Sequence, residues 1–217
     1  MFTKLWNNKI LPKNLPELCF GWNHSLIKLN GEIKHGAFVY IYHFHHCDNY
    51  SVEPLWVFPD KTIYFQLQWG EVCSTLVRLT ELISNGTIVG FPPVGSQIVD
   101  YNRFVFRVTE VDSRVNSDDI LLEIKDVWKQ LASEPDSLDL CRSAVRQYCE
   151  TLTEESLTNL RETYFSIPNS RRSFLLSMDA KDHLVRQILA TEDKDQIQEL
   201  TARLKEEIEY SWSNEIN

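Results

Sequence analysis

Three side chains that can bind metals recur at every second position near the end of the stretch GAFVYIYHFHHC, residues 36–47. Alternate residues of a β-strand share a face, so His43, His45 and Cys47 would point the same way, with neighbours about 6 to 7 Å apart. Imidazole and thiolate ligands suit zinc or another divalent transition metal. The spacing makes these residues a candidate metal site, where a bound ion would activate water for hydrolysis.

The same three residues also have an interpretation without a metal. Histidines at a strand end are commonly neutral and hydrogen-bonded, and Cys47 would serve as a small buried hydrophobe. No Cys-x-x-Cys or His-Glu-x-x-His motif accompanies them. We therefore expect no cofactor, and zinc or another divalent metal is the alternative.

Cys73 is a candidate nucleophile because of its expected place at the start of a helix. Apolar residues recur at helical spacing from about residue 71 to residue 85, and Asn85-Gly86 is a natural helix end. The positive end of the helix dipole would favour a thiolate at Cys73. The opposing interpretation is a packing residue, since the sequence supplies no third group to orient a nucleophile and its base.

The last candidate group lies in residues 169–189. On a helix that starts near Asp179, Asp179 and His183 are four residues apart and share a face, as do Asp182 and Arg186. Two carboxylates and a histidine are the components of a metal site or an acid/base pair. The simpler interpretation is a helix start with ordinary intrahelical charge pairs.

The elements that must position these residues differ between the two halves of the chain. All seven glycines and most aromatic residues precede residue 111, whereas the excess of acidic residues follows it. Residues 36–47 and 62–69 alternate as strands do, and both faces of the first are apolar at its start, which predicts a central strand covered on both sides. We expect residues 62–69 to pair antiparallel with it.

Helical periodicity dominates after residue 116. Capping residues precede helices expected at about 117–131, 137–152, 154–167 and 193–212, and Pro135 separates the first two. The sequence thus predicts an α+β protein. Its N-terminal part is a mostly antiparallel sheet with one packed helix at about 71–85, and an all-helical segment follows. The expected segments are 1–112, rich in aromatic residues, and 117–217, acidic; they form either separate units or one domain.

Composition excludes some functions. The net charge of −9 disfavours nucleic acid, which clustered lysines and arginines would bind. No apolar run approaches the roughly 20 residues that span a bilayer. Five scattered cysteines without an export signal predict a cytoplasmic location with reduced thiols.

These observations predict a soluble, acidic protein of the interaction or regulatory kind, without catalysis. Its contact with a protein partner or a second copy would run through the helical half. One alternative is a metal-dependent hydrolase that uses His43, His45 and Cys47. Another is a small-ligand binder with an aromatic cleft beside Tyr40, Tyr42 and Tyr64.

Overall fold

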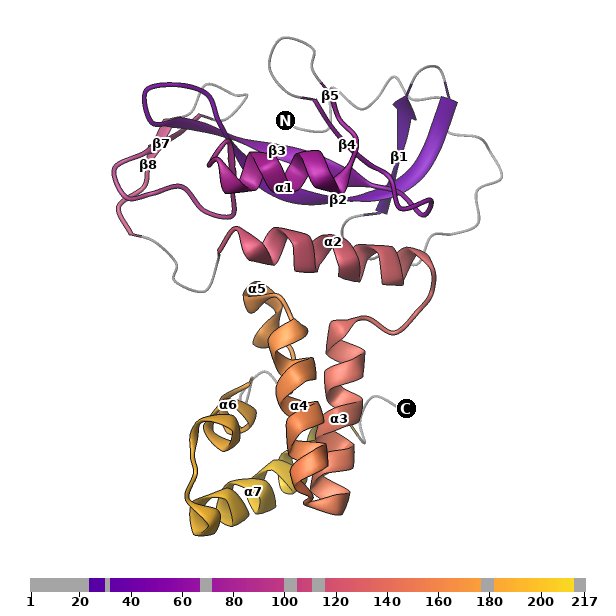
Figure 1. Cartoon of the computed structure of the whole chain (residues 1–217), viewed down its shortest axis with the longest axis vertical. Coiled ribbons are helices and arrows are strands. Elements are labelled where there is room, and N and C mark those ends of the chain that lie inside the picture. The colour runs from indigo at the N-terminus through magenta and orange to yellow at the C-terminus, as the bar shows by residue number, and fades with distance from the viewer. Residues whose placement is uncertain are drawn as a thin grey trace.

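The computed structural model describes most of the chain. The described residues are 24–29, 32–66, 72–99, 105–110, 116–176 and 182–212. A sheet carrying two helices forms one end of the molecule, and a group of helices forms the other (Figure 1). The predicted α+β class, with a mostly antiparallel sheet followed by a helical segment, is confirmed.

Most strand pairs in the sheet are antiparallel, and neighbours in the chain are neighbours in space. The strands are β1 (His24–Leu29), β2 (Glu32–Phe44), β3 (Asn49–Val57), β4 (Ile63–Gln66), β5 (Val72–Cys73), β6 (Ile88–Val89), β7 (Gln97–Val99) and β8 (Val105–Arg107). The order runs β1-β2-β3-β4-β5, while β6 pairs with the end of β2 and β8 pairs with β7. Only β7 runs parallel to its neighbour, β3, among the described strand pairs.

The long hairpin of β2 and β3 is the centre of the sheet. β2 lies between β1 and β3, which confirms the predicted central strand. The expectation that residues 62–69 pair with it is wrong, because β3 follows directly after a short turn and occupies that edge of β2. β4 pairs with β3 instead, through Trp56 opposite Tyr64 and Val57 opposite Ile63.

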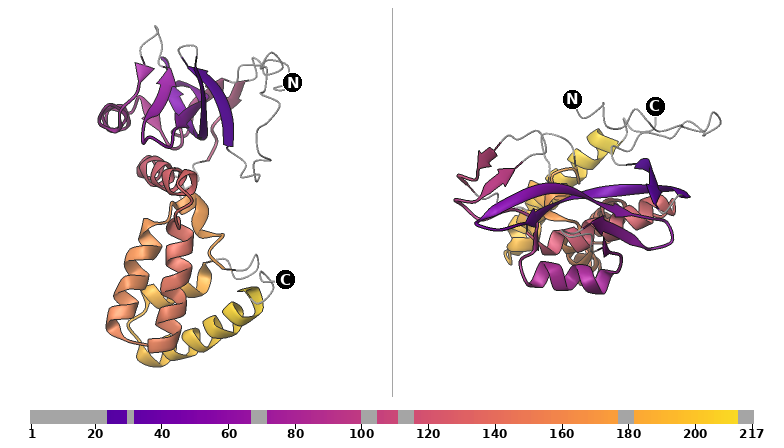
Figure 2. Two further views of the ribbon diagram at one scale, coloured as in Figure 1. Left: turned by 90° about the vertical axis from the view of Figure 1, so that its right-hand side faces the viewer. Right: turned by 90° about the horizontal axis from the view of Figure 1, so that it is seen from above.

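One face of the sheet is covered by α1 (Leu76–Ser84) and α2 (Asp118–Leu131), which lie on the same side of it (Figure 2). The shared core contains Ala37, Val39 and Ile41 of β2 together with apolar residues of both helices. Its most buried members are Ile41, Leu55, Val57, Leu79, Ile88 and Ile124. A Cβ atom at Gly90 would collide with the carbonyl of Asn116, so only glycine permits this close approach of the β6 exit to the start of α2.

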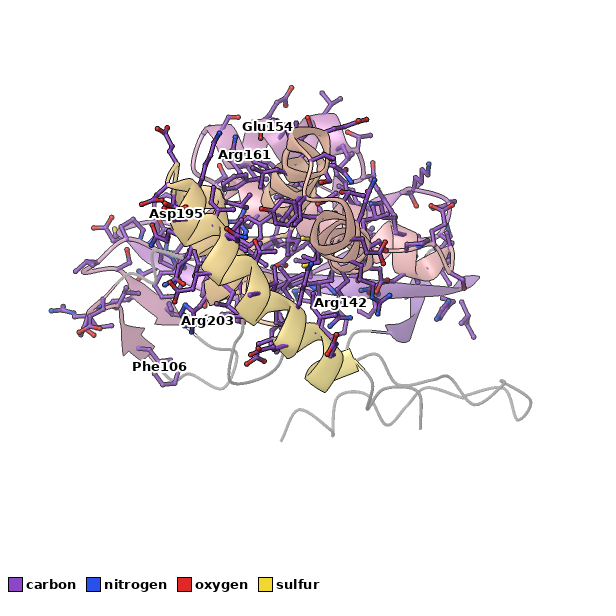
Figure 3. The ribbon with its side chains drawn as sticks, turned by 90° about the horizontal axis from the view of Figure 1, so that it is seen from below. Phe106, Arg142, Glu154, Arg161, Asp195 and Arg203 are labelled. Atoms are coloured by element: carbon purple, nitrogen blue, oxygen red, sulfur yellow. The ribbon has the colours of Figure 1, made fainter. Side chains whose placement is uncertain are left out.

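The second half of the chain forms a separate core. Its helices are α3 (Ser137–Thr151), α4 (Glu154–Ser166), α5 (Asn169–Arg172), α6 (His183–Ala190) and α7 (Lys194–Trp212). Two predicted caps are present: Asp136 accepts hydrogen bonds from the first backbone amides of α3, and Thr153 caps α4 in the same way. The cap expected at Ser117 is wrong, because its hydroxyl accepts from the Gly90 amide and Asn116 Oδ1 accepts from the Asp119 amide instead. α7 runs obliquely across the ends of α3 and α4 (Figure 3), with Leu200 and Leu204 in the common core.

Candidate functional site

His43 and His45 stand at the end of β2 on the face that the helices cover. Their ring centroids are 4.8 Å apart, and the edge of His43 meets the ring of Phe65 at 5.2 Å. The expectation that the two histidines share a face is therefore confirmed. His43 is only 4% exposed, so it belongs to the rim of the core.

His45 is the first member of a short chain of hydrogen bonds. Its Nε2 lies 2.6 Å from the hydroxyl of Ser51, and that hydroxyl donates to Glu53 Oε1 at 2.8 Å. Because the Ser51 proton goes to Glu53, His45 must be the donor toward Ser51. This direction is opposite to the one that would activate a serine nucleophile.

Both imidazoles favour the neutral form. Burial lowers the pKa of His43, and the neighbouring His45 lowers it further, although Glu53 acts against both. Burial also lowers the pKa of His45, again opposed by Glu53. Neutral rings are suited to hydrogen bonding and to metal binding alike, so their titration does not separate the two interpretations.

Cys47 does not share the face of the two histidines, and that part of the expectation is wrong. β2 ends at Phe44, and the amide of His45 bonds the Asn49 carbonyl at 2.9 Å to close a turn. Cys47 lies in this turn with a left-handed φ of 50° and is exposed. Strict alternation of faces ceases where the strand ends. Within the described parts of the chain, no three His, Cys, Asp or Glu side chains converge to hold a metal. A metal on His43 and His45 stays a prediction.

Cys73 lies in a strand, which corrects its expected place in the first turn of a helix. It pairs with Phe65 in the β4–β5 ladder and is fully buried. α1 begins only at Leu76, because Thr75 caps it by accepting from the amide of Arg78. Cys73 is therefore not at the positive end of the helix dipole.

The acid and histidine group of residues 169–189 is only partly described. Asp179 lies outside the described residues. Asp182 precedes α6 and accepts a hydrogen bond of 2.6 Å from the Tyr164 hydroxyl, while His183 is exposed and its Nδ1 contacts Arg186 at 2.8 Å. The partners of Asp182 and His183 thus differ from the pairs expected from helical spacing.

The face of the sheet opposite the helices is aromatic. Even-numbered residues of β2 point to it, and the register places Phe38 opposite Trp56, Tyr40 opposite Pro54 and Phe44 opposite Tyr50. Their rings meet edge to face: Phe38 lies 5.1 Å from Tyr40 and 5.3 Å from Trp56. We call the set Phe38, Tyr40, Tyr42, Phe44, Val52, Pro54, Trp56 and Tyr64 the aromatic face.

No helix among the described residues covers the aromatic face (Figure 2). Tyr40, near its middle, is 63% exposed, whereas Trp56 is buried. The prediction that β2 is covered on both sides is therefore wrong at Tyr40. Alternation showed that both faces were apolar, but it could not show which face receives the helices.

A polar cluster joins the two ends of the molecule. The guanidinium of Arg171 in α5 contacts Asp126 of α2 at 2.6 Å and Asp136, the cap of α3, at 2.7 Å. The Ser137 amide and hydroxyl also donate to Asp126. Both carboxylates are buried, so the pairing is structural. Sequence analysis did not connect these residues, because they are far apart in the chain.

Comparison with known proteins gives two family matches. Residues 26–135 match the family described as "Domain of unknown function (DUF7638)", and residues 136–214 match "Domain of unknown function (DUF7639)". The two matches meet between α2 and α3, beside the Asp126–Arg171–Asp136 cluster. No curated protein and no solved structure matches the chain. None of the described helices is long and apolar enough to cross a membrane.

Proposed function

The chain belongs to the DUF7638 family, and we propose that it is a non-catalytic protein-interaction module that contacts its partner through the aromatic face. The observation that carries this proposal is the exposure of Tyr40 within a surface built almost wholly from aromatic and aliphatic side chains. Large uncharged surfaces of this kind are uncommon on monomers and typical of contact sites.

The composition of the aromatic face suits the centre of a protein interface. Tyrosine, tryptophan and phenylalanine are enriched at such centres and carry much of the binding energy. Tyr40 and Tyr42 each offer a large rigid ring with a hydroxyl at its tip, which can bond the partner while the ring is buried. The strands fix where each side chain leaves the backbone, and edge-to-face contacts join Phe38 to Tyr40 and Trp56, so part of the ordering precedes binding.

None of the eight side chains that define the aromatic face is charged, although Lys34 extends from the same face nearer the start of β2. The chemistry of the partner follows from this composition. The matching surface would be apolar with isolated hydrogen-bonding groups. Binding of this kind depends weakly on ionic strength, since screening acts on charges. A protein surface, either of another chain or of a second copy, fits this requirement.

The helical half, where sequence analysis placed the contact, is the second candidate surface. Its outward side chains carry both signs of charge, as Figure 3 shows for Arg161, Glu154 and Asp195. Phe165 and Phe174 are nevertheless 56% and 63% exposed. Arg172 stacks on Phe165 at 5.4 Å, so this smaller surface combines an aromatic ring with a cation.

We place the protein in the cytoplasm and assign it no nucleic-acid partner. Four described cysteines are free thiols, which is typical of a reducing compartment. The net charge of −9 would repel phosphate backbones.

The proposal is tested by comparing capture of partners by two matched variants. Tyr40→Thr/Tyr42→Thr removes two rings but retains strand preference, because threonine is β-branched. Val77→Thr is the control, since Val77 is 73% exposed on α1, on the other side of the sheet. We expect one defined partner, or a dimer by light scattering, with wild type and the control but not with the tyrosine variant. Equal capture by all three proteins would reject the aromatic face.

A further inference from the structure

A cavity of about 360 Å³ lies where the two ends of the molecule meet. Its walls come from the turn between β3 and β4, from α2, from the start of α3 and from the end of α4. The size falls within the range of small-molecule sites in proteins. The cavity is separate from the aromatic face, because α2 packs on the opposite side of the sheet.

Three lysines from two segments of the chain line the cavity. Lys61 comes from the β3–β4 turn, and Lys125 and Lys129 come from adjacent turns of α2. Among the described residues, no carboxylate forms an ion pair with any of the three. Three lysines at one site are an uneven distribution of charge in a chain with a net charge of −9.

The acids in the cavity wall do not neutralise these lysines. Asp126 is already saturated by Arg171 at 2.6 Å and by the amide and hydroxyl of Ser137. Glu134 is the other acidic lining residue and is exposed in the connection between α2 and α3. The local balance is therefore positive, and an anion entering the cavity would meet a favourable potential.

Trp128 supplies a further donor without a partner. It lines the cavity, and its indole Nε1 is buried with no acceptor among the described residues. A buried N–H without an acceptor costs free energy, and such groups in folded proteins commonly mark a site that a ligand or water completes. The indole N–H and the three lysine ammonium groups are all hydrogen-bond donors.

A tight turn holds the backbone of Lys61. Lys61 has a φ of 62°, in the left-handed region that glycine or asparagine normally occupies. Its amide bonds the Phe58 carbonyl at 3.0 Å, which closes the turn. The turn therefore fixes the backbone from which the Lys61 side chain extends.

We propose that the cavity lined by Lys61, Lys125, Lys129 and Trp128 binds a small organic anion through a phosphate or carboxylate group. The ammonium groups would neutralise the anion. The indole Nε1 has no exposed surface, so the Trp128 ring would turn for its N–H to donate to an oxygen of the anion. The indole ring offers an apolar surface for the remainder of the ligand. This site is independent of the protein contact proposed for the aromatic face.

The test is a titration of the ¹⁵N-labelled full chain with small anions. NMR spectra monitor the indole N–H resonance of Trp128 during the titration. Trp128→Phe assigns the resonance. The probes are phenyl phosphate, citrate as a carboxylate, and phenol as the uncharged match to phenyl phosphate. We expect a saturable shift with phenyl phosphate or citrate, with a Kd of about 1 mM or lower, and none with phenol. The anion that shifts the resonance identifies the group that is bound.

Matched lysine variants decide whether the cavity is responsible. Lys125→Ala/Lys129→Ala should weaken binding about tenfold or more, whereas Lys194→Ala/Lys205→Ala on α7 should leave it unchanged. Circular dichroism checks folding, and the single Lys125→Ala variant replaces the double one if that is destabilised. Absence of a saturable shift with both anions, or equal binding by the Lys125 variants and wild type, would overturn the proposal.

Discussion

Arg171 and Asp126 form a salt bridge of 2.6 Å that ties the helical half to α2, the helix lying on the sheet. Asp126 is 4% exposed, and the second acceptor of Arg171, Asp136, is almost as buried. The same contact adjoins the cavity and the boundary between the two family matches. It therefore fixes how the two ends of the molecule meet.

Removing Arg171 should destabilise the fold strongly. Arg171→Ala leaves two buried carboxylates without their cation, which typically costs about 3 to 5 kcal/mol. Arg203→Ala on the exposed side of α7 should change stability by less than about 0.5 kcal/mol. Urea unfolding followed by circular dichroism measures both. A loss below about 1 kcal/mol for Arg171→Ala would show that the cluster is not the joint between the two ends.

Stability should fall between about pH 7 and pH 5 because of His43. Burial and His45 lower its pKa in the folded protein, so the unfolded chain binds protons first as the pH falls. The stabilisation is complete above the unfolded pKa of about 6.5 and is lost as the pH drops through the lower folded value. In the His43→Asn variant, stability should fall less steeply as the pH drops from about 7 to about 5. Midpoints of urea unfolding, measured across this pH range, test this. Parallel curves for the two proteins would contradict the assignment.

Purified protein should contain metal well below one equivalent. His45 is engaged with Ser51 at 2.6 Å, and Cys47 lies in a turn away from the face of the histidines. Elemental analysis of chelator-free protein, beside His43→Ala/His45→Ala, measures this. About one equivalent of zinc in wild type and none in the variant would instead support the metal-dependent alternative.

Cys47 should be the fastest of the four described cysteines to react with iodoacetamide. It is exposed, whereas Cys73, Cys141 and Cys149 are buried. Burial raises the pKa of Cys141 to about 12 and that of Cys149 to about 11, which suppresses the reactive thiolate. Peptide mapping by mass spectrometry should find Cys47 modified about a hundredfold faster. Comparable rates at Cys141 would mean that the helical core opens readily.

Sequence patterns within a few residues predicted most helices and the central strand. The cap at Thr153, and a start of α3 at Asp136 or Ser137, were predicted because such side chains satisfy free amides at helix starts, which depends on neighbouring residues alone. Alternation in β2 correctly grouped His43 with His45. These features depend on contacts within a few residues, which a sequence displays directly.

Features that depend on distant segments could not be predicted. The position of Cys73 is an exception, because it depends on the nearby cap Thr75, which starts α1 later than the expected residue 71. Which face of β2 is covered depends on where α1 and α2 pack. Lys61 lines the same cavity as Lys125 and Lys129 because the β3–β4 turn lies beside α2 in the folded chain. The division at residues 112–117 stays a prediction; α2, beyond it, packs on the sheet.

The most direct test of the aromatic face is site-specific photo-cross-linking in cells that produce the protein. A benzophenone amino acid replaces Tyr40 in one variant and Phe165 in another, both at exposed positions with an aromatic side chain. The account predicts that the probe at position 40 forms a cross-link to one defined protein or to a second copy, and that the probe at position 165 does not. A cross-link from position 165 alone, or none from position 40, would contradict the account and direct attention to the helical half.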